Sequence, residues 1–147
     1  MRMIRVVIVD DYPYMRFGLR ELLNAEADIE VVAECADGQE AVELAGHLRP
    51  DVVLTDLKMP GLDGAEATKR LLARDLDVAV VVLTSAPHGE LAVRATVAGA
   101  HAMLAKNLDG SLVVAAVRAA AARARRPVPT RQCGDEPPGC GDAPLDT

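Results

Sequence analysis

The sequence predicts an α/β fold, a doubly wound parallel sheet with helices on both faces. Two features carry this prediction. Short apolar runs rich in β-branched residues alternate along the chain with longer segments in which apolar residues recur at helical spacing. Half of the residues are hydrophobic, but only 2% are aromatic and there is no Trp, so the core must be aliphatic. A core of Val, Leu, Ile and Ala suits parallel strands that are covered on both faces.

Five apolar runs are expected to be strands, because each is too short for a helix and most are rich in Val or Ile. They cover residues 4–9, 29–33, 52–55, 78–83 and, more weakly, 102–104. The connections between them are short, which favours right-handed crossovers between parallel strands. Numbered along the chain, the strands are therefore expected in the order 2-1-3-4-5, the flavodoxin-like arrangement.

The segments between the strands have the apolar spacing of amphipathic helices. Pro13 is well placed to open the first helix, where its missing N–H has no consequence. Asp37 and Asp63 are suited to cap the second and third helices, and Gly99 suits a left-handed ending of the fourth. The expected helices cover about 13–25, 38–49, 64–74, 88–98 and 108–123.

The chain is expected to form one folded domain, residues 1–123, followed by a Pro/Gly-rich tail, residues 124–147. A chain of 147 residues has room for one domain and little more. Five of the nine prolines fall between Pro127 and Pro144, and the tail has almost nothing to bury. We therefore expect the tail to be disordered.

Composition excludes several classes of function. The net charge of −6 argues against nucleic-acid binding by the body of the protein. Cys35, Cys133 and Cys140 have no metal-binding spacing and form no even disulfide set, which favours a reduced, cytoplasmic setting. No signal peptide is visible, and no segment approaches the ~18 consecutive apolar residues of a membrane span.

Acidic residues follow two of the expected strands. Asp10 and Asp11 close the first apolar run, and Asp56 closes the third. Because the carboxyl ends of parallel neighbours meet at one rim, we expect these three side chains to converge there. Three carboxylates within a few ångströms of one another repel by several kcal/mol at an intermediate dielectric, so the cluster needs a proton or a cation. Oxygen-only ligands with room for water favour Mg²⁺ or Mn²⁺, although either acidic stretch, taken alone, could simply cap a loop.

Several motifs, in order and in one register from about residue 4 to residue 122, resemble the response-regulator receiver domain of two-component systems. They read Val-Asp-Asp-Tyr-Pro at 9–13, Asp-Leu-Lys-Met-Pro-Gly-Leu-Asp-Gly at 56–64, Leu-Thr-Ser at 83–85, Ala-Gly-Ala at 98–100, and Lys106. Asn107 after the lysine, together with Ala-Asp-Gly-Gln-Glu-Ala at 36–41, resembles the NarL/FixJ (LuxR-type) subfamily. Members of that subfamily usually carry a C-terminal helix-turn-helix output domain, and no recognisable one follows here.

The resemblance implies a role for each acid at the rim. Asp56 corresponds to the phosphoacceptor of the family. Asp10, Asp11 and Asp56, with the backbone carbonyl of Lys58, correspond to the ligands of Mg²⁺ or Mn²⁺.

The resemblance also implies a set of residues that respond to phosphorylation. Lys106 would pair with Asp56 and then with the phosphoryl group, and Thr84 would move to donate its hydroxyl to a phosphoryl oxygen. Met103 stands at a second switch position, three residues before the lysine, where the family commonly has an aromatic residue. A flexible Met could fill or vacate the same space but makes no aromatic or hydroxyl contact.

The implied function is that of a phosphoacceptor response regulator in a two-component phosphorelay. A sensor histidine kinase would phosphorylate Asp56, and the protein would regulate transcription if it is linked to a DNA-binding output domain. No enzymatic activity is expected beyond its own phosphorylation and dephosphorylation. An aspartyl-phosphate phosphatase needs a second acid two residues after the nucleophile, and Lys58 stands there instead.

A second interpretation is a stand-alone or phosphorylation-independent receiver that acts as a dimerisation or docking module or as a phosphate sink. Without a helix-turn-helix, the chain could be a stand-alone receiver, a fragment, or a receiver with a remnant of a lost output domain. The alanine-rich helix expected at 108–123 offers a close-packing surface. A homodimer could form through helices 88–98 and 108–123, or through 13–25 and 108–123.

Overall fold

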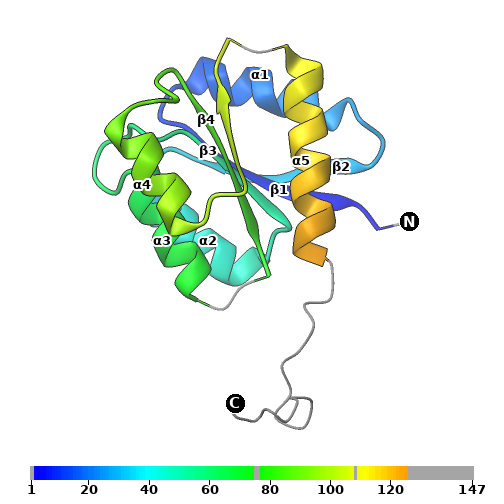
Figure 1. Ribbon diagram of the computed structural model, residues 1–147. Coiled ribbons are helices and arrows are strands. Elements are labelled where there is room, and N and C mark those ends of the chain that lie inside the picture. The colour runs from blue at the N-terminus through cyan, green and yellow to red at the C-terminus, as the bar shows by residue number, and fades with distance from the viewer. Residues whose placement is uncertain (1, 75–76, 108, 126–147) are drawn as a thin grey trace, which may run out of the picture.

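The computed structural model describes residues 2–74, 77–107 and 109–125. In this part of the chain, five parallel strands form one sheet in the order β2-β1-β3-β4-β5 (Figure 1). The strands are β1 (Ile4–Val9), β2 (Ile29–Cys35), β3 (Val52–Thr55), β4 (Ala79–Thr84) and β5 (Ala102–Ala105). The predicted flavodoxin-like strand order is therefore confirmed.

Helices cover both faces of the sheet. They are α1 (Pro13–Asn24), α2 (Gly38–Leu48), α3 (Gly64–Ala73), α4 (Glu90–Ala98) and α5 (Gly110–Arg125). Helices α1 and α5 pack on one face, and α2, α3 and α4 pack on the other (Figure 1). Among residues 2–74, 77–107 and 109–125, the helices lack the combination of length and hydrophobicity that a membrane-spanning segment needs.

The core is aliphatic and lies in two layers, one on each face of the sheet. Successive residues of β1 supply both layers: Val7 and Val9 face α2, α3 and α4, whereas Val6 and Ile8 face α1 and α5. All four residues of β3 are buried, as expected of a central strand covered on both sides. This sheet is the rigid frame that presents the ends of its strands at one rim.

The predicted helix ends are confirmed where side chains or backbone determine them. Asp37 accepts a hydrogen bond from the backbone N–H of Glu40 at 2.8 Å, and Asp63 accepts one from Glu66 at 2.8 Å. Gly99 ends α4 with a φ of 112°, a left-handed conformation that favours glycine.

Some boundaries differ from the sequence prediction. Strand β2 continues through Cys35, which was expected to end it, because Cys35 still pairs with Val9 of β1. Helix α4 begins at Glu90 rather than at about residue 88. Helix α5 continues to Arg125, beyond the predicted boundary at 123, because Ala124 still packs against the core. The rest of the predicted tail, residues 126–147, lies outside the described residues.

Candidate functional site

A cavity of about 630 Å³ opens at the carboxyl ends of the strands. Strand ends from β1, β3, β4 and β5 contribute Asp10, Asp56, Thr84 and Lys106 to its lining. These residues are separated by up to 96 positions in the sequence, yet the parallel sheet places them around one opening. The site lies where ligands bind in open α/β sheets.

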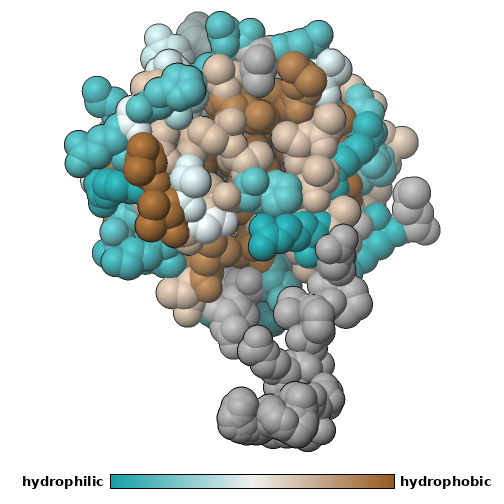
Figure 2. Space-filling model, in the orientation of Figure 1, coloured by the Kyte–Doolittle hydropathy of each residue, from teal (hydrophilic) through white to brown (hydrophobic). Residues whose placement is uncertain are grey.

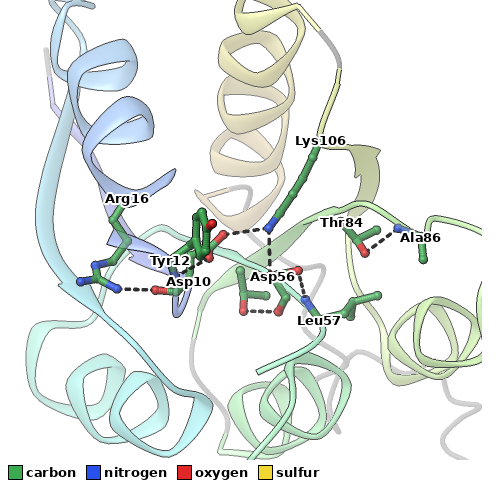
Figure 3. A network of polar contacts seen from close by, with 9 residues as sticks. Asp10, Tyr12, Arg16, Asp56, Leu57, Thr84, Ala86 and Lys106 are labelled. Carbon is green, nitrogen blue, oxygen red and sulfur yellow. Dashed lines mark hydrogen bonds and ion pairs between the residues drawn. The ribbon is translucent and has the colours of Figure 1, made fainter. Parts of the chain in front are cut away.

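Lys106 reaches between two of the acids (Figure 3). Its Nζ atom lies 2.9 Å from Oδ2 of Asp56 and 3.1 Å from Oδ2 of Asp10. Both carboxylates are nearly inaccessible, with exposed fractions of 2% for Asp10 and 8% for Asp56. The ammonium group therefore bridges two buried carboxylates, the geometry in which charge–charge contacts are strongest.

Backbone hydrogen bonds hold both carboxylates in place. The N–H of Leu57 donates to Oδ1 of Asp56 at 2.7 Å, and the N–H of Tyr12 donates to Oδ1 of Asp10 at 2.9 Å (Figure 3). The N–H of Asp56 in turn donates to the carbonyl of Val9 at 2.9 Å, which ties the end of β3 to the end of β1. One oxygen of each carboxylate is thus fixed by backbone, and the other faces Lys106.

Burial and ion pairing shift two pKa values in this cluster. Burial raises the pKa of the Asp10 carboxyl above its ordinary value, although the hydrogen bonds from Tyr12 and Lys106 lower it in part. Burial lowers the pKa of the Lys106 ammonium, but its hydrogen bonds to Asp56 and Asp10 outweigh this effect and raise the pKa overall. Lys106 is therefore charged at neutral pH.

The three acids fit a divalent cation. One carboxylate oxygen from each of Asp10, Asp11 and Asp56 lies within 4.8 Å of the other two. Asp11 is exposed, which leaves an open side for water, and Lys58 lines the same cavity. An all-oxygen set of ligands beside water is the environment that Mg²⁺ or Mn²⁺ prefers.

Thr84 lies in the cavity wall at the end of β4. Its side chain is buried, and its hydroxyl oxygen accepts a hydrogen bond from the backbone N–H of Ala86 at 3.1 Å (Figure 3). The carbonyl of Thr84 accepts a hydrogen bond from the N–H of Lys106 at 2.9 Å, so the two residues are linked through backbone.

Met103 does not line the cavity. It is half-buried in β5 opposite Val82 of β4, and it packs against the core layer under α2, α3 and α4. Met103 therefore packs on the sheet face that α2, α3 and α4 cover, outside the lining of the cavity.

Comparison with known proteins places this arrangement in a family. The family model for the response regulator receiver domain matches residues 6–118. The chain belongs to the receiver domain family. This match contains all of the strand-end residues that converge at the cavity.

Curated relatives of this receiver domain include transcriptional regulators. The chain is 43% identical to the transcriptional regulatory protein LiaR of Bacillus subtilis over 118 residues, covering 80% of this chain and 56% of LiaR. It is 36% identical to the nitrate/nitrite response regulator protein NarL of Escherichia coli over 117 residues, covering 80% and 54%. The chain thus spans about half the length of the curated relatives it matches.

Solved structures share the fold. The signal receiver domain of NarL from Mycobacterium tuberculosis matches with a TM-score of 0.77 and 33% identity, covering 83% of this chain and 98% of that one. The response regulator domain of CheB from Thermotoga maritima matches with a TM-score of 0.75 and 31% identity, covering 82% and 98%. The CheX–CheY–BeF₃–Mg²⁺ complex from Borrelia burgdorferi matches with a TM-score of 0.71 and 26% identity, covering 78% and 87%.

The receiver domain also has site residues that sequence reasoning missed. Tyr12 and Met15 line one side of the cavity, and Glu90 and Leu91 at the start of α4 line another. Tyr12 directly follows the acids in the sequence and could have been suspected on that ground. The position of Glu90 and Leu91 in the cavity wall depends on how α4 packs against the sheet, so no local sequence pattern predicts it.

Gly64 is a further missed residue, because it determines the path of the backbone around Asp56. A Cβ atom at this position would lie 2.1 Å from the backbone oxygen of Asp56 and 2.8 Å from Cα of Leu57. The N–H of Gly64 donates to the carbonyl of Leu57 at 2.8 Å. Only glycine lets the start of α3 approach the strand end this closely.

Proposed function

We propose that this receiver domain is the phosphoacceptor of a two-component phosphorelay and that Asp56 takes a phosphoryl group from a sensor histidine kinase. The observation that carries the proposal is the contact of Asp56 with Lys106, 2.9 Å apart, beside Asp10 and Asp11 in one open cavity. An acyl phosphate at Asp56 needs cationic partners for its oxygens, and the ammonium of Lys106 is placed to be one of them. The family is one of signalling domains rather than of classical enzymes.

The chemistry is a transfer between two nucleophiles. A carboxylate oxygen of Asp56 attacks the phosphorus of a phosphohistidine, the O–P bond forms, and the N–P bond to the imidazole breaks with its electron pair remaining on nitrogen. Lys106 pairs with Asp56 before the transfer and with a phosphoryl oxygen afterwards. Its ammonium stabilises the added charge, because the surrounding carboxylates keep it protonated.

A divalent metal ion fits this scheme. Asp10, Asp11, Asp56 and the carbonyl of Lys58 would hold Mg²⁺ or Mn²⁺, which would share the charge of the phosphoryl oxygens. The Borrelia burgdorferi relative is described as a complex with BeF₃ and Mg²⁺, and BeF₃ has the charge and shape of a phosphoryl group. That complex therefore supports the proposal that a phosphoryl group and a divalent metal ion occupy this site together.

Thr84 would report the phosphorylated state. Its hydroxyl now accepts a hydrogen bond from Ala86, and on phosphorylation it would donate to a phosphoryl oxygen. Because this contact anchors the segment between β4 and α4, its rearrangement would shift the start of α4. Met103 would accompany this change by repacking in β5 rather than by turning an aromatic ring.

The wider role follows from the relatives. LiaR and NarL are regulators of transcription or of nitrate/nitrite response, so a DNA-binding output would make this receiver a transcription regulator. We place the protein in the cytoplasm with the catalytic part of its kinase, and we assign no nucleic-acid contact to residues 2–125 themselves. Homodimerisation through α4 and α5, or through α1 and α5, would couple phosphorylation to output.

Mass spectrometry of the intact protein tests the proposal. Incubation with acetyl phosphate or phosphoramidate and Mg²⁺ should add one phosphoryl group, and Asp56→Asn should abolish the addition. Asp77→Asn, which changes an exposed acid outside the cavity, should phosphorylate like the wild type. A folded protein that gains no phosphoryl group from any donor would instead favour the docking-module interpretation, to which Met103 at the switch position lends support.

A further inference from the structure

A second cavity, of about 440 Å³, lies between helices α3 and α4 and away from the acidic site. Its apolar lining comes from Ala65 of α3 and from Val93, Val97 and Ala98 of α4. Val93 and Val97 are one helical turn apart and are 58% and 82% exposed. Figure 2 shows a strongly hydrophobic strip on the surface over α4 with hydrophilic residues beside it. We call this feature the α3–α4 groove.

The groove has a positive rim. Lys69 of α3 and Arg94 of α4 both line it, and neither forms an ion pair or a side-chain hydrogen bond within the described residues. The acid of the groove, Glu66, is already paired with Arg70 at 3.2 Å. Two cations without acidic partners thus flank exposed valines, in a chain whose net charge is −6. An occupant that matches this surface combines acidic and apolar residues.

The part of the chain beyond α5 starts close to this groove. The guanidinium Nη1 of Arg123, in the last turn of α5, lies 3.5 Å from Nδ1 of His101, two residues after the end of α4 at Gly99. Helix α4 has nine residues and is therefore about 13 Å long. The nine residues 126–134 can span up to ~30 Å, so whatever follows them can reach the whole length of α4.

The residues that follow have the matching chemistry. Segment 135–147 contains Asp135, Glu136, Asp142 and Asp146, and it contains no Lys or Arg. It also contains three prolines and Leu145, which offer apolar surface next to the acids. The basic residues of the tail, by contrast, lie before this segment.

We propose that the acidic segment 135–147 docks in the α3–α4 groove of its own chain. Its acids face Lys69 and Arg94, and Leu145 with the neighbouring prolines covers Val93 and Val97. A second copy of the chain fits less well, because a symmetric contact would bring the same two cations of both copies into one interface. Docking of the segment instead neutralises those cations and removes the exposed valines from water.

Paramagnetic relaxation in the full chain tests the proposal. The variant Cys133→Ser is labelled with a nitroxide at Cys140, while Cys35 is buried and its thiol pKa is raised to about 12, so it reacts slowly. The methyl signals of Val93 and Val97 should broaden more than those of Leu19, which lies on the opposite face of the sheet. Most of this broadening should disappear at 1 M salt, where charges are screened beyond ~3 Å.

Two variants separate docking from chance proximity. Lys69→Gln with Arg94→Gln should remove most of the broadening at Val93 and Val97, whereas Arg131→Gln should leave it unchanged. Amide spectra check that each variant remains folded. Broadening of equal size at Leu19, or broadening that survives the double substitution, would overturn the proposal. A mixed sample provides a further control, in which one set of chains carries the isotope label and the other set carries the nitroxide. Broadening of the Val93 and Val97 signals in this mixture would show contact between copies and would also overturn the proposal.

Discussion

Replacing Lys106 by Met removes the ammonium group that bridges two buried carboxylates. Its Nζ atom lies 2.9 Å from Asp56 and 3.1 Å from Asp10. At an effective dielectric constant of 20, each of these pairs attracts by about 5–6 kcal/mol before desolvation is counted. Because burial of the ammonium and repulsion between the acids offset most of this, and because Lys106 retains 21% exposure, we expect the variant to lose about 2–3 kcal/mol of unfolding free energy at pH 7.

The loss should depend on pH in a defined direction. Without the ammonium, which lowers it in part, the folded-state pKa of the Asp10 carboxyl should rise further above its unfolded value. Such a group favours the folded state below the unfolded pKa, and this advantage is lost as pH rises through the folded pKa. The difference between Lys106→Met and the wild type should therefore be small near pH 4 and large near pH 7. The wild type should lose its own Lys106 contribution only above the ordinary lysine pKa of 10.5, because the pKa of Lys106 is raised.

Urea unfolding at the two pH values, with and without Mg²⁺, measures these effects. Mg²⁺ should stabilise the Lys106→Met variant more than the wild type, because a cation then replaces the missing charge among the acids. Lys58→Met is the matched control, since Lys58 is exposed and should change stability by less than about 0.5 kcal/mol. Equal unfolding midpoints for Lys106→Met and the wild type at pH 7 would refute the view that the ammonium holds this site together.

Three further predictions concern the backbone and an ion pair on the surface. Gly64→Ala should destabilise the fold by about 1–3 kcal/mol in urea unfolding and slow the phosphorylation of Asp56, because its Cβ would lie 2.1 Å from that residue's backbone oxygen. Gly18→Ala, in the middle of α1 with nothing within 4 Å, should stabilise by about 0.5–1 kcal/mol; a loss of stability there would contradict the helical assignment. Arg118→Gln should raise the pKa of Asp28 in an NMR titration, because the guanidinium now lowers that pKa; an unchanged titration would exclude the pairing. The stabilisation from this pair is present above the ordinary Asp pKa and is lost as pH falls through the lowered value.

Much of the fold could be predicted because the relevant patterns are local. The apolar run at Ile4–Val9 is too short and too β-branched for a helix, and the structure has a strand there. Asp37 and Asp63 were recognisable as helix caps because a carboxylate three residues before an N–H can accept its hydrogen bond. Neighbouring residues in the sequence are sufficient to determine each of these features.

Boundaries that depend on partners far along the chain were predicted less well. Strand β2 runs on to Cys35 because the edge of β1 is still available to pair there, which the composition of Glu34 and Cys35 does not indicate. Helix α5 extends to Arg125 because Ala124 still packs against the core. In both cases a tertiary contact adds residues to an element that local preference would have ended.

The sequence by itself determined which side chains stand at the ends of the strands, because alternation of strand and helix leaves Asp10, Asp56 and Lys106 just past the predicted strands. Only the tertiary structure decided how those ends meet: Lys106 lies between two carboxylates, the Thr84 hydroxyl accepts a hydrogen bond from the backbone N–H of Ala86, and the start of α4 forms a wall of the cavity. The reason is geometric, since the distance between two strand ends depends on strand order, register and helix packing over the whole sheet.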